Sequence, residues 1–501
     1  MNLTLFLLFP LATAIAILLA SGLKQIRVIA LIGSLLQLAL SGKLLLAYYE
    51  QRAAGNQSQM LFEYVQKWYG PLNLQYHIGV DGISIAMILL TAFVVVAGIL
   101  VSWETEHLSK EFFFLLVLLS LGAYGFFISL DVFTMFFFLE VAVIPKFLLI
   151  GIWGSGKKEY SAMKLALMLM GGSALILVGM LGIYFSSKTA GGAHSFDLLE
   201  LAKMNIPLAR QMLFFPFAFI GFGIFTAIFP FHTWVPDGHA SAPTAASMFL
   251  AGISMKLGGY GCLRVATYLM PDAAHAYSWV IILLATIAII YGAFATMMQT
   301  DLKYINAYSS VSHCGFVLLG IGMLTQTSIN GAVMQMVSHG LMTALFFAAI
   351  GMVYSRTHTR MVAQLGGLLK IMPFISTVFV IAGLCSLGLP GFSGFAAEMT
   401  VFMGSWQNPD KWYRLATILA CASIVVTAVY ILRAAGKSIM GPLGNDSYKD
   451  LTDAKWYEKS AAILLIFGIL VVGMAPFWLI NLIQPGTEFI MNKLAVVATG
   501  L

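Results

Sequence analysis

The sequence predicts an all-α polytopic membrane protein, a single membrane domain over residues 1–501 that crosses the bilayer about fourteen times. Sixty per cent of the 501 residues are hydrophobic and only 10% are charged. The mean hydropathy is +0.90, and apolar runs close to the ~20 residues of a membrane-spanning helix recur along the chain. Because backbone groups in lipid must hydrogen bond internally, such runs indicate helices, whereas a strand barrel would show shorter alternating segments.

The expected helices follow from these apolar runs, taken in order along the chain. Three fall in residues 1–110, five in 111–269, five in 277–436 and the last in 458–481. The first run has no basic segment before it, so we expect an uncleaved helix rather than a signal peptide. The predicted spans are 3–21, 26–48, 81–102, 111–128, 131–152, 162–185, 209–229, 240–269, 277–298, 305–323, 330–354, 374–404, 413–436 and 458–481.

Two of these spans contain residues that interrupt a helix, near 229–237 and near 388–394. Each interrupted span is the fourth of a five-helix group, and an odd number of helices makes two copies opposite in orientation. The sequence therefore predicts two inverted five-helix repeats with discontinuous helices, although proline and glycine are also common in other membrane helices. The predicted helix-break residues are Pro230, His232, Pro236, His239, Pro390 and Gly391.

Lysine and arginine are in excess in the loops that follow odd-numbered helices, where we expect Lys164 and Lys303, over the loops of the opposite side, where we expect Arg264. Such residues collect on the cytoplasmic side of a membrane protein. Both termini are therefore predicted on the outer side, which is the periplasm for a bacterial inner membrane. The net charge of +6 reflects this topology in a lipid bilayer, and it does not indicate nucleic acid binding, which would need clustered basic residues on a solvated domain.

The sequence contains no cofactor pattern. Its four cysteines lie in predicted helices without CxxC spacing, which favours packing over a metal site or a disulfide. It has neither a nucleotide fingerprint nor a cysteine cluster for iron–sulfur ligation. We expect this chain to bind no metal and no redox cofactor.

Three ionisable residues lie deep in apolar stretches: Glu140, Lys256 and Glu398. Such a group in hydrocarbon costs a few kcal/mol or more unless it faces a partner, a cavity or water. His313 and His339 lie on neighbouring predicted helices and can relay protons, because histidine titrates near neutrality. We predict a proton path through these five residues.

Each of these residues also has a structural interpretation. Glu140 could be a protonated acid bonded to a backbone carbonyl, Lys256 a member of a structural pair, and Glu398 a counter-ion for another subunit. A buried histidine is often only a satisfied hydrogen-bonding group. His232 and His239, which flank the first predicted break, fit either interpretation equally.

Lys146 follows Glu140 by six residues, about 9 Å along a helix axis and about 120° around it. The two side chains therefore do not stack as i,i+4 partners do, although Pro145 and the long lysine stem leave an approach open. The alternative is that Lys146 extends to the cytoplasmic face. The sequence favours neither.

Several motifs resemble those of one family. The segment 230–239 (Pro-Phe-His-Thr-Trp-Val-Pro-Asp-Gly-His), with matches in 242–252, resembles the signature of the antiporter-like subunits of complex I and of Mrp-type antiporters. The segment 307–316 (Ala-Tyr-Ser-Ser-Val-Ser-His-Cys-Gly-Phe) is a second strong match, and 389–392 adds to it. The likeness covers residues 80–440.

Within that family the chain looks most like the M-type subunits of proton-translocating NADH–quinone oxidoreductase. The resemblance implies Glu140 as a coupling acid, Lys256 as a central lysine and Glu398 as an exit-side acid. It implies a translocase subunit without a redox centre of its own, beside L-type and N-type subunits in a membrane arm. NADH, FMN, iron–sulfur clusters and quinone would then be bound by partner subunits.

The sequence departs from the family pattern at one position. The family usually carries a lysine five residues before Pro230, where this chain has Phe225. We expect either that Lys146 replaces the missing partner of Glu140, or that this copy transmits or seals without pumping. The alternative functions are an Mrp-type cation/proton antiporter subunit, an ion-translocating subunit of a membrane-bound hydrogenase, and a structural spacer.

Overall fold

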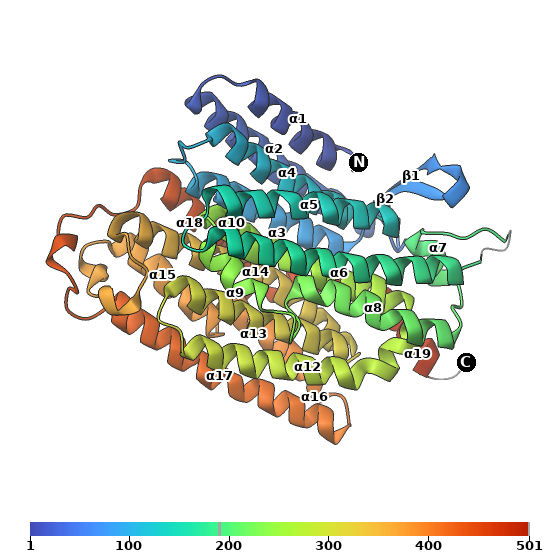
Figure 1. Cartoon of the computed structure of the whole chain (residues 1–501). Coiled ribbons are helices and arrows are strands. Elements are labelled where there is room, and N and C mark those ends of the chain that lie inside the picture. The colour runs from blue at the N-terminus through green and yellow to red at the C-terminus, as the bar shows by residue number, and fades with distance from the viewer. Residues whose placement is uncertain (189–191, 499–501) are drawn as a thin grey trace.

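The computed structural model describes residues 1–188 and 192–498. Its long helices run side by side across Figure 1, and the β-hairpin and both ends of the chain lie at one end of the bundle. We call this the hairpin end. The loops 358–372 and 439–455 lie at the opposite end.

Within the described residues, ten helices are long and apolar enough to cross a membrane, which agrees with the predicted all-α polytopic fold. They are α2 (Leu23–Ala53), α3 (Gly82–Val101), α4 (Ser109–Ile128), α5 (Val132–Trp153), α6 (Lys158–Ser186), α8 (Leu208–Thr226), α12 (Pro271–Met297), α14 (Gln326–Thr357), α17 (Lys411–Ser438) and α18 (Trp456–Met474). The remaining predicted spans coincide with α1 (Leu5–Leu19), α13 (Leu302–Gly322), the stretch from α10 to η3 described below, and the pair α15 (Pro373–Ser386) and α16 (Ser393–Trp406).

Aspartate side chains fix the starts of several helices. The carboxylate of Asp81 accepts a hydrogen bond from the backbone N–H of Ser84 at 2.9 Å, and that of Asp131 accepts one from Thr134 at 3.0 Å. A capping oxygen satisfies one of the N–H groups that the first helical turn leaves free. This is why α3 and α5 begin where they do, at the hairpin end.

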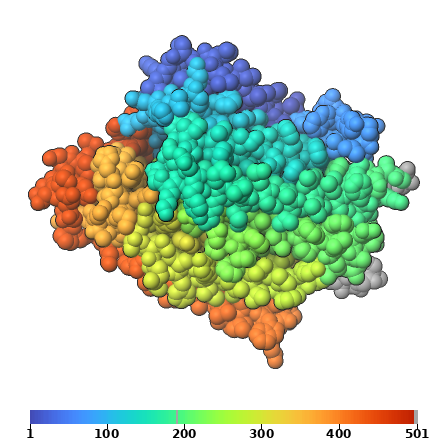
Figure 2. Space-filling view, in the orientation of Figure 1, coloured from blue at the N-terminus to red at the C-terminus, as the bar shows by residue number. Residues whose placement is uncertain are grey.

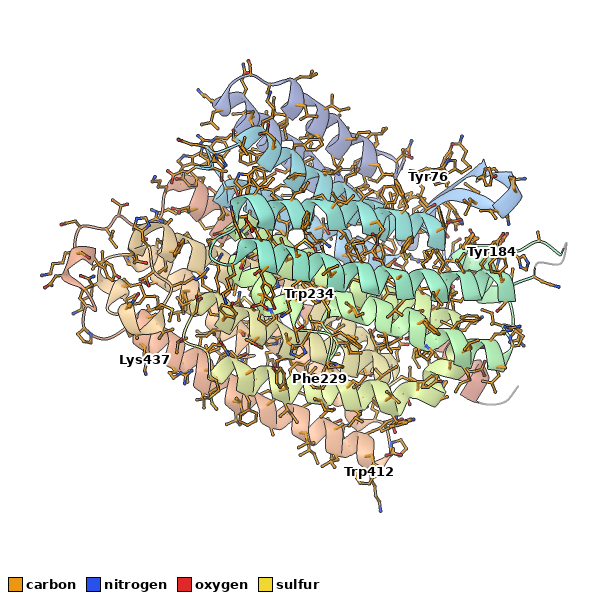
Figure 3. All side chains as sticks on the ribbon, viewed as in Figure 1. Tyr76, Tyr184, Phe229, Trp234, Trp412 and Lys437 are labelled. Atoms are coloured by element: carbon orange, nitrogen blue, oxygen red, sulfur yellow. The ribbon has the colours of Figure 1, made fainter. Side chains whose placement is uncertain are left out.

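The first helix break is displaced from the predicted position. Helix α8 ends at Thr226, Ala227 adopts a left-handed conformation with φ +69°, and the chain becomes helical again at Trp234. The break therefore covers 227–233 rather than 229–237. In Figure 3, Phe229 of the break and Trp234, the first residue of the next helix, lie near the middle of the bundle, away from both ends.

Two of the predicted breaker residues are consequently helical. Pro236 and His239 belong to α9 (Trp234–Ser241), whereas Pro230 and His232 lie in the break. Proline is tolerated in the first turn of a helix, since its missing N–H has no partner there in any case. Pro236 therefore marks the start of a helix, and the prediction that it interrupts one is wrong.

The second break lies close to its predicted position. It covers 387–392, between α15 and α16, and contains Pro390. Gly388 and Gly391 both adopt positive φ angles, +73° and +96°. Glycine reaches this left-handed region without the steric penalty that a Cβ atom imposes, so the paired glycines allow the chain to leave the helix after α15 and to start α16.

The span that carries Lys256 is irregular in a different way. It consists of α10 (Thr244–Phe249), the π-helical turns η2 (Leu250–Ser254) and η3 (Cys262–Thr267), and α11 (Met255–Gly261) between them. π-Helical turns in membrane and soluble helices are frequent at functional sites. Lys256 lies in the short regular segment between two such turns.

Two elements differ from the sequence-based expectation. The predicted loop 50–80 contains an antiparallel hairpin of β1 (Leu61–Tyr69) and β2 (Leu74–Val80). The predicted span 458–481 corresponds to α18, which ends earlier, at Met474, and a separate helix, α19 (Pro476–Ala498), follows it. Helix α19 packs against α3, α12 and α14, and it leads to the hairpin end (Figure 1).

Helix α14 is the centre of the bundle, because its membrane-spanning window is buried along its whole length. The outer face in Figure 2 is formed by earlier helices, in cyan and green, and by α12, in yellow-green. Residues in this window of α14 are therefore shielded from lipid. This is where the sequence places His339.

Candidate functional site

Lys256 is buried among protein groups and does not reach lipid, with 1% of its surface exposed. Its Nζ donates a hydrogen bond to the carbonyl of Ala251, which belongs to the π-turn η2, and lies 2.7 Å from Nδ1 of His339 on α14. The π-turn therefore supplies an acceptor to the lysine. A lysine joined to a histidine in this way can pass a proton to it.

His339 and His313 are neighbours across α14 and α13. Their ring centroids are 5.5 Å apart, and both residues are buried. Cys314 of α13 has its Sγ 3.8 Å from Nδ1 of His339. The prediction that these two histidines lie on adjacent helices is confirmed, and the structure brings the side chains themselves together.

Glu398 completes this row of groups. Its Oε1 lies 3.2 Å from Nδ1 of His313, and the other ring nitrogen of His313 lies 3.1 Å from Oγ of Ser386. Ser386 is the last residue of α15, so the second helix break places a hydroxyl beside the histidine. Glu398 itself is 3% exposed. Lys256, His339, His313 and Glu398 thus form one continuous polar row across the bundle.

Glu140 lies apart from this row. It is partly exposed on the outside of α5, and its carboxylate accepts a hydrogen bond from Oγ of Ser173 on α6. The serine was not predicted as a partner. Its hydroxyl stabilises either the charged or the neutral carboxyl group, because a hydroxyl can donate and accept.

Lys146 points into the protein and is 1% exposed, so the alternative that it extends to the membrane surface does not hold. Its Nζ has no hydrogen-bond partner among the described residues. It lies 5.8 Å from the ring centroid of Phe225, and it is attracted electrostatically by Glu140. The ammonium group is therefore beside the position where the family resemblance places a lysine on α8.

The two histidines near the first break have different surroundings. His232 packs edge-on against Tyr291 of α12, with 4.9 Å between ring centroids. His239 stacks on Phe347 of α14 at 5.1 Å, and Lys256 and Lys303 act on it electrostatically. Both ring nitrogens of His239 lack a partner among the described residues. Both buried lysines thus act on His239, whereas His232 lies in the helix break beside α12.

A group of charged residues that includes Lys164 and Lys303, both expected in loops, lies beside α9. Asp237 pairs with Lys164 of α6 at 2.7 Å and accepts a hydrogen bond from the hydroxyl of Tyr304 at 3.3 Å. Lys303, at the start of α13, is 4% exposed and donates to the carbonyl of Ala242 at 2.6 Å. The signal that could have located Lys303 is its place directly before the matched motif 307–316.

Arg264 was also counted as a loop residue and is fully buried. It pairs with Asp81, the capping residue of α3, and its guanidinium lies 5.5 Å from the ring centroid of Tyr260. A buried arginine is tolerated only when a carboxylate and hydrogen bonds compensate it. This pair joins the start of α3 to the irregular span that holds Lys256.

At the hairpin end, His77 of β2 lies between two carboxylates. Its Nδ1 contacts Asp197, which caps α7 (Leu198–Lys203), and its Nε2 lies 3.3 Å from Glu63 of β1. Burial alone would lower the pKa of His77, but Asp197 and Glu63 together outweigh burial and raise the pKa. No group of three or more His, Cys, Asp or Glu side chains in residues 1–188 and 192–498 could hold a metal ion.

The chain is similar to membrane subunits of respiratory complexes over most of its length. The family described as NADH:quinone oxidoreductase/Mrp antiporter, TM matches residues 129–427. An NAD(P)H-quinone oxidoreductase chain 4 of Thermosynechococcus vestitus is 37% identical over 95% of this chain and 89% of its own length. NADH-quinone oxidoreductase subunit M of Rickettsia prowazekii is 36% identical over 87% of this chain and 88% of its own.

Solved structures share the fold. A chain of respiratory complex I from Thermus thermophilus superimposes with a TM-score of 0.88 at 24% identity, covering 98% of this chain and 99% of its own. A chain of the Mrp complex from Dietzia sp. gives a TM-score of 0.84 at 18% identity, covering 98% of both chains.

Proposed function

This chain belongs to the NADH:quinone oxidoreductase/Mrp antiporter family of membrane proteins, and we propose that it is a proton-translocating subunit in the membrane arm of an NADH–quinone oxidoreductase. The observation that carries this function is the row Lys256, His339, His313 and Glu398. A row of titratable groups held in contact inside a membrane protein supports proton transfer between them.

The driving force would come from partner subunits. Moving one charge against 100 mV requires about 2.3 kcal/mol, and the buried row supplies no such energy by itself. In this proposal NADH, FMN, iron–sulfur clusters and quinone are bound by the partners. The chain acts as a translocase subunit and carries no redox centre.

The chain would act through two inverted five-helix units, 111–269 and 277–436. The position of one broken span in each unit supports this division, since broken helices commonly border the ion site of inverted-repeat transporters. Both termini lie at the hairpin end (Figure 1), which we assign to the outer, periplasmic side of a bacterial inner membrane from the lysine and arginine bias of the loops.

Glu140 faces outward, which supports contact with a neighbouring subunit. Phe137 and Ile144, one turn before and after it, are 45% and 61% exposed. An ionisable carboxyl group on a face in contact with lipid costs a few kcal/mol, so this face of α5 is better suited to another protein chain. We assign the neighbours on the two sides to the L-type and N-type antiporter-like subunits.

Lys146 would take the role of the lysine that α8 lacks. The ammonium group lies over the ring of Phe225 and is fully buried, and the attraction of Glu140 reaches it. The cation is thus retained in space, although it comes from α5. A subunit that merely transmits or seals would gain nothing from a buried charge without a hydrogen-bond partner among the described residues, because such a charge destabilises the fold.

An Mrp-type antiporter subunit is the second candidate, supported by the similar fold of the Mrp complex chain. The test is proton pumping by the native assembly in liposomes, driven by its own electron donor. Glu398→Gln and Lys256→Met should each abolish or strongly reduce pumping per electron. A structural spacer would tolerate both substitutions, and an assembly that lacks redox subunits would support the antiporter.

A further inference from the structure

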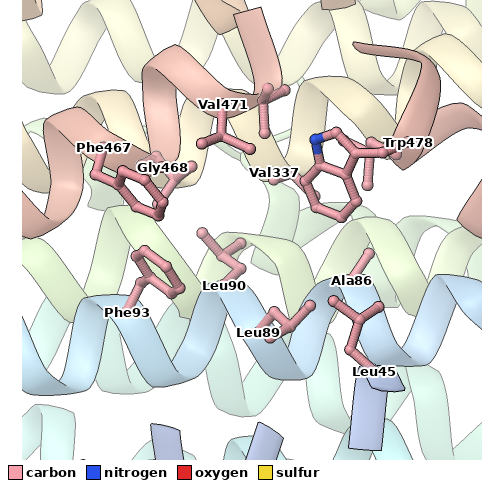
Figure 4. A pocket seen from close by; sticks show the side chains of 13 residues that line it. Leu45, Ala86, Leu89, Leu90, Phe93, Val337, Phe467, Gly468, Val471 and Trp478 are labelled. Carbon is pink, nitrogen blue, oxygen red and sulfur yellow. The ribbon is translucent and has the colours of Figure 1, made fainter. Parts of the chain in front are cut away.

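An apolar crevice of about 240 Å³ lies between α2, α3, α14, α18 and α19, on the side of α14 away from the polar row. In Figure 4, α3 forms one wall and α18 the other. The crevice extends from Ala86 to Phe93 along α3, which is about 10 Å of helix. Leu45, Leu89 and Phe93 on its walls are partly exposed, so it is open towards the membrane.

Trp478 closes one end of this crevice and brings the only side-chain N–H group to its described lining. The indole nitrogen lies on the edge of the ring that faces the crevice (Figure 4). It is buried and has no hydrogen-bond partner among the described residues. A buried N–H without an acceptor costs about 1–3 kcal/mol, so a ligand that carries an acceptor at this point would gain that energy.

Positive charge lies beyond the same end of the crevice. The hydroxyl of Tyr49 on α2 donates to the backbone carbonyl of Trp478 at 3.2 Å, and Arg52 follows Tyr49 by one helical turn. Arg52 donates through one guanidinium nitrogen to two backbone carbonyls, of Asn56 and Ser58. It forms no ion pair within residues 1–188 and 192–498.

We propose that this crevice binds one phospholipid. An acyl chain fills the crevice between α3 and α18, an ester carbonyl accepts the hydrogen bond of the Trp478 indole, and the phosphate lies towards Arg52. This order of apolar tail, acceptor and anion is the order of groups in a glycerophospholipid, and tryptophan occurs at the depth of the lipid ester groups in membrane proteins. A quinone would match the tail and the acceptor but not the cation.

The probe is phosphatidylglycerol with a diazirine near the end of one acyl chain. The intact purified complex is incubated with it, irradiated and digested, and the labelled peptides are identified by mass spectrometry. The label should concentrate on the segments around Phe93, Leu341 and Phe467, at the far end of the crevice from Trp478. Excess unlabelled phosphatidylglycerol should compete for it.

Variants separate this site from lipid bound all over the surface. Trp478→Phe keeps an aromatic ring at this position and removes the indole N–H, so it should weaken labelling about tenfold. Leu89→Trp should abolish labelling by filling the crevice, whereas Leu46→Trp, on an exposed neighbour outside the crevice, should leave it unchanged. Arg52→Gln should weaken labelling by the anionic lipid, and the amount of assembled complex serves as the folding control.

Three outcomes would overturn the proposal. Labelling spread evenly over the exposed helices would mean ordinary surface lipid. Labelling that Trp478→Phe and Leu89→Trp leave unchanged would place the lipid elsewhere. Competition by decylubiquinone but not by phosphatidylglycerol would make the ligand a quinone.

Discussion

Replacing Lys146 with methionine tests whether this lysine is the working partner of Glu140. Methionine fills a similar volume and removes the charge. The two residues are about 9 Å apart along α5, and at an effective dielectric constant of ~20 two unit charges at that separation interact by about 2 kcal/mol. The loss of Lys146 should therefore remove about 2 kcal/mol of electrostatic attraction between the two side chains.

The same substitution should not destabilise the protein. Lys146 has no hydrogen-bond partner among the described residues, and its contact with Phe225 contributes only about 0.5–2 kcal/mol. Replacing a buried charge by an apolar side chain is often neutral or stabilising. A purely structural lysine would lower stability on removal, so the combination of retained thermal stability and lost pumping identifies a functional role.

The assay is proton uptake by liposomes that contain the purified complex, measured per electron with a pH-sensitive dye. Lys146→Met should reduce the ratio of protons to electrons, as Glu140→Gln should, and the double variant Lys146→Met/Phe225→Lys should restore it. Lys43→Met, which removes an exposed lysine of α2, is the matched control. If Lys146→Met pumps like the wild type while Glu140→Gln does not pump, Lys146 is not the replacement partner.

Three further predictions concern other parts of the fold. Gly388→Ala should reduce pumping, because the added Cβ would lie 2.8 Å from Oε2 of Glu398. Gly391 is also left-handed, but a Cβ added there would have no atom within 4 Å, so Gly391→Ala should assemble with similar backbone strain and still pump. Arg356→Met should lower the amount of folded protein in membranes, because breaking the buried ion pair of Arg356 with Glu458 costs about 3–5 kcal/mol. The amount is measured by immunoblot, and the double variant Arg356→Met/Glu458→Gln should recover most of the loss. The raised pKa of His77 means that its contacts stabilise the hairpin fully below pH 6.5 and progressively less as the pH rises through the raised value. The protection of the amides in 61–80 against hydrogen exchange, measured relative to their intrinsic exchange rates, should therefore fall over that range in the wild type. The same pH profile of protection in His77→Gln would contradict this.

Hydrophobic length predicted the membrane helices well, because a membrane span needs a long apolar run and little else. The same criterion failed for α19. The sequence of α19 includes Gln484, Glu488 and Lys493, so only its apolar first residues were recognised. These residues were joined to α18 across Pro476 in the predicted span 458–481. Proline in the first helical turn is a start signal, and it could have separated the two helices. The hairpin was missed because the exposed first strand lacks the strict alternation of apolar and polar residues that marks a half-buried strand in a sequence.

The polar row was predictable as a set of residues but not as a set of contacts. Isolated charges in apolar sequence are costly, so Lys256 and Glu398 could be recognised one by one. The serine partners of Glu140 and His313, which are Ser173 and Ser386, could not be recognised, because serine is common and inexpensive in membrane helices. Arg264 and Lys303 were assigned to loops since they lie near predicted helix ends, and only the packing shows that they are buried.

In the proposed arrangement the cation comes from α5 instead of α8, and this restricts how the first half of the protein can work. A carboxylate and a lysine on two different helices can be separated by relative movement of the helices. Glu140 and Lys146 are on one helix, so their separation along its axis is fixed and only side-chain rotation can alter it. We infer that the charge on this pair is controlled from outside α5, at the exposed face of Glu140 where a neighbouring subunit would bind. A change of charge there acts on Glu140 directly and on Lys146 through it, whereas in the second half the row from Lys256 to Glu398 spans several helices and can be opened by their movement.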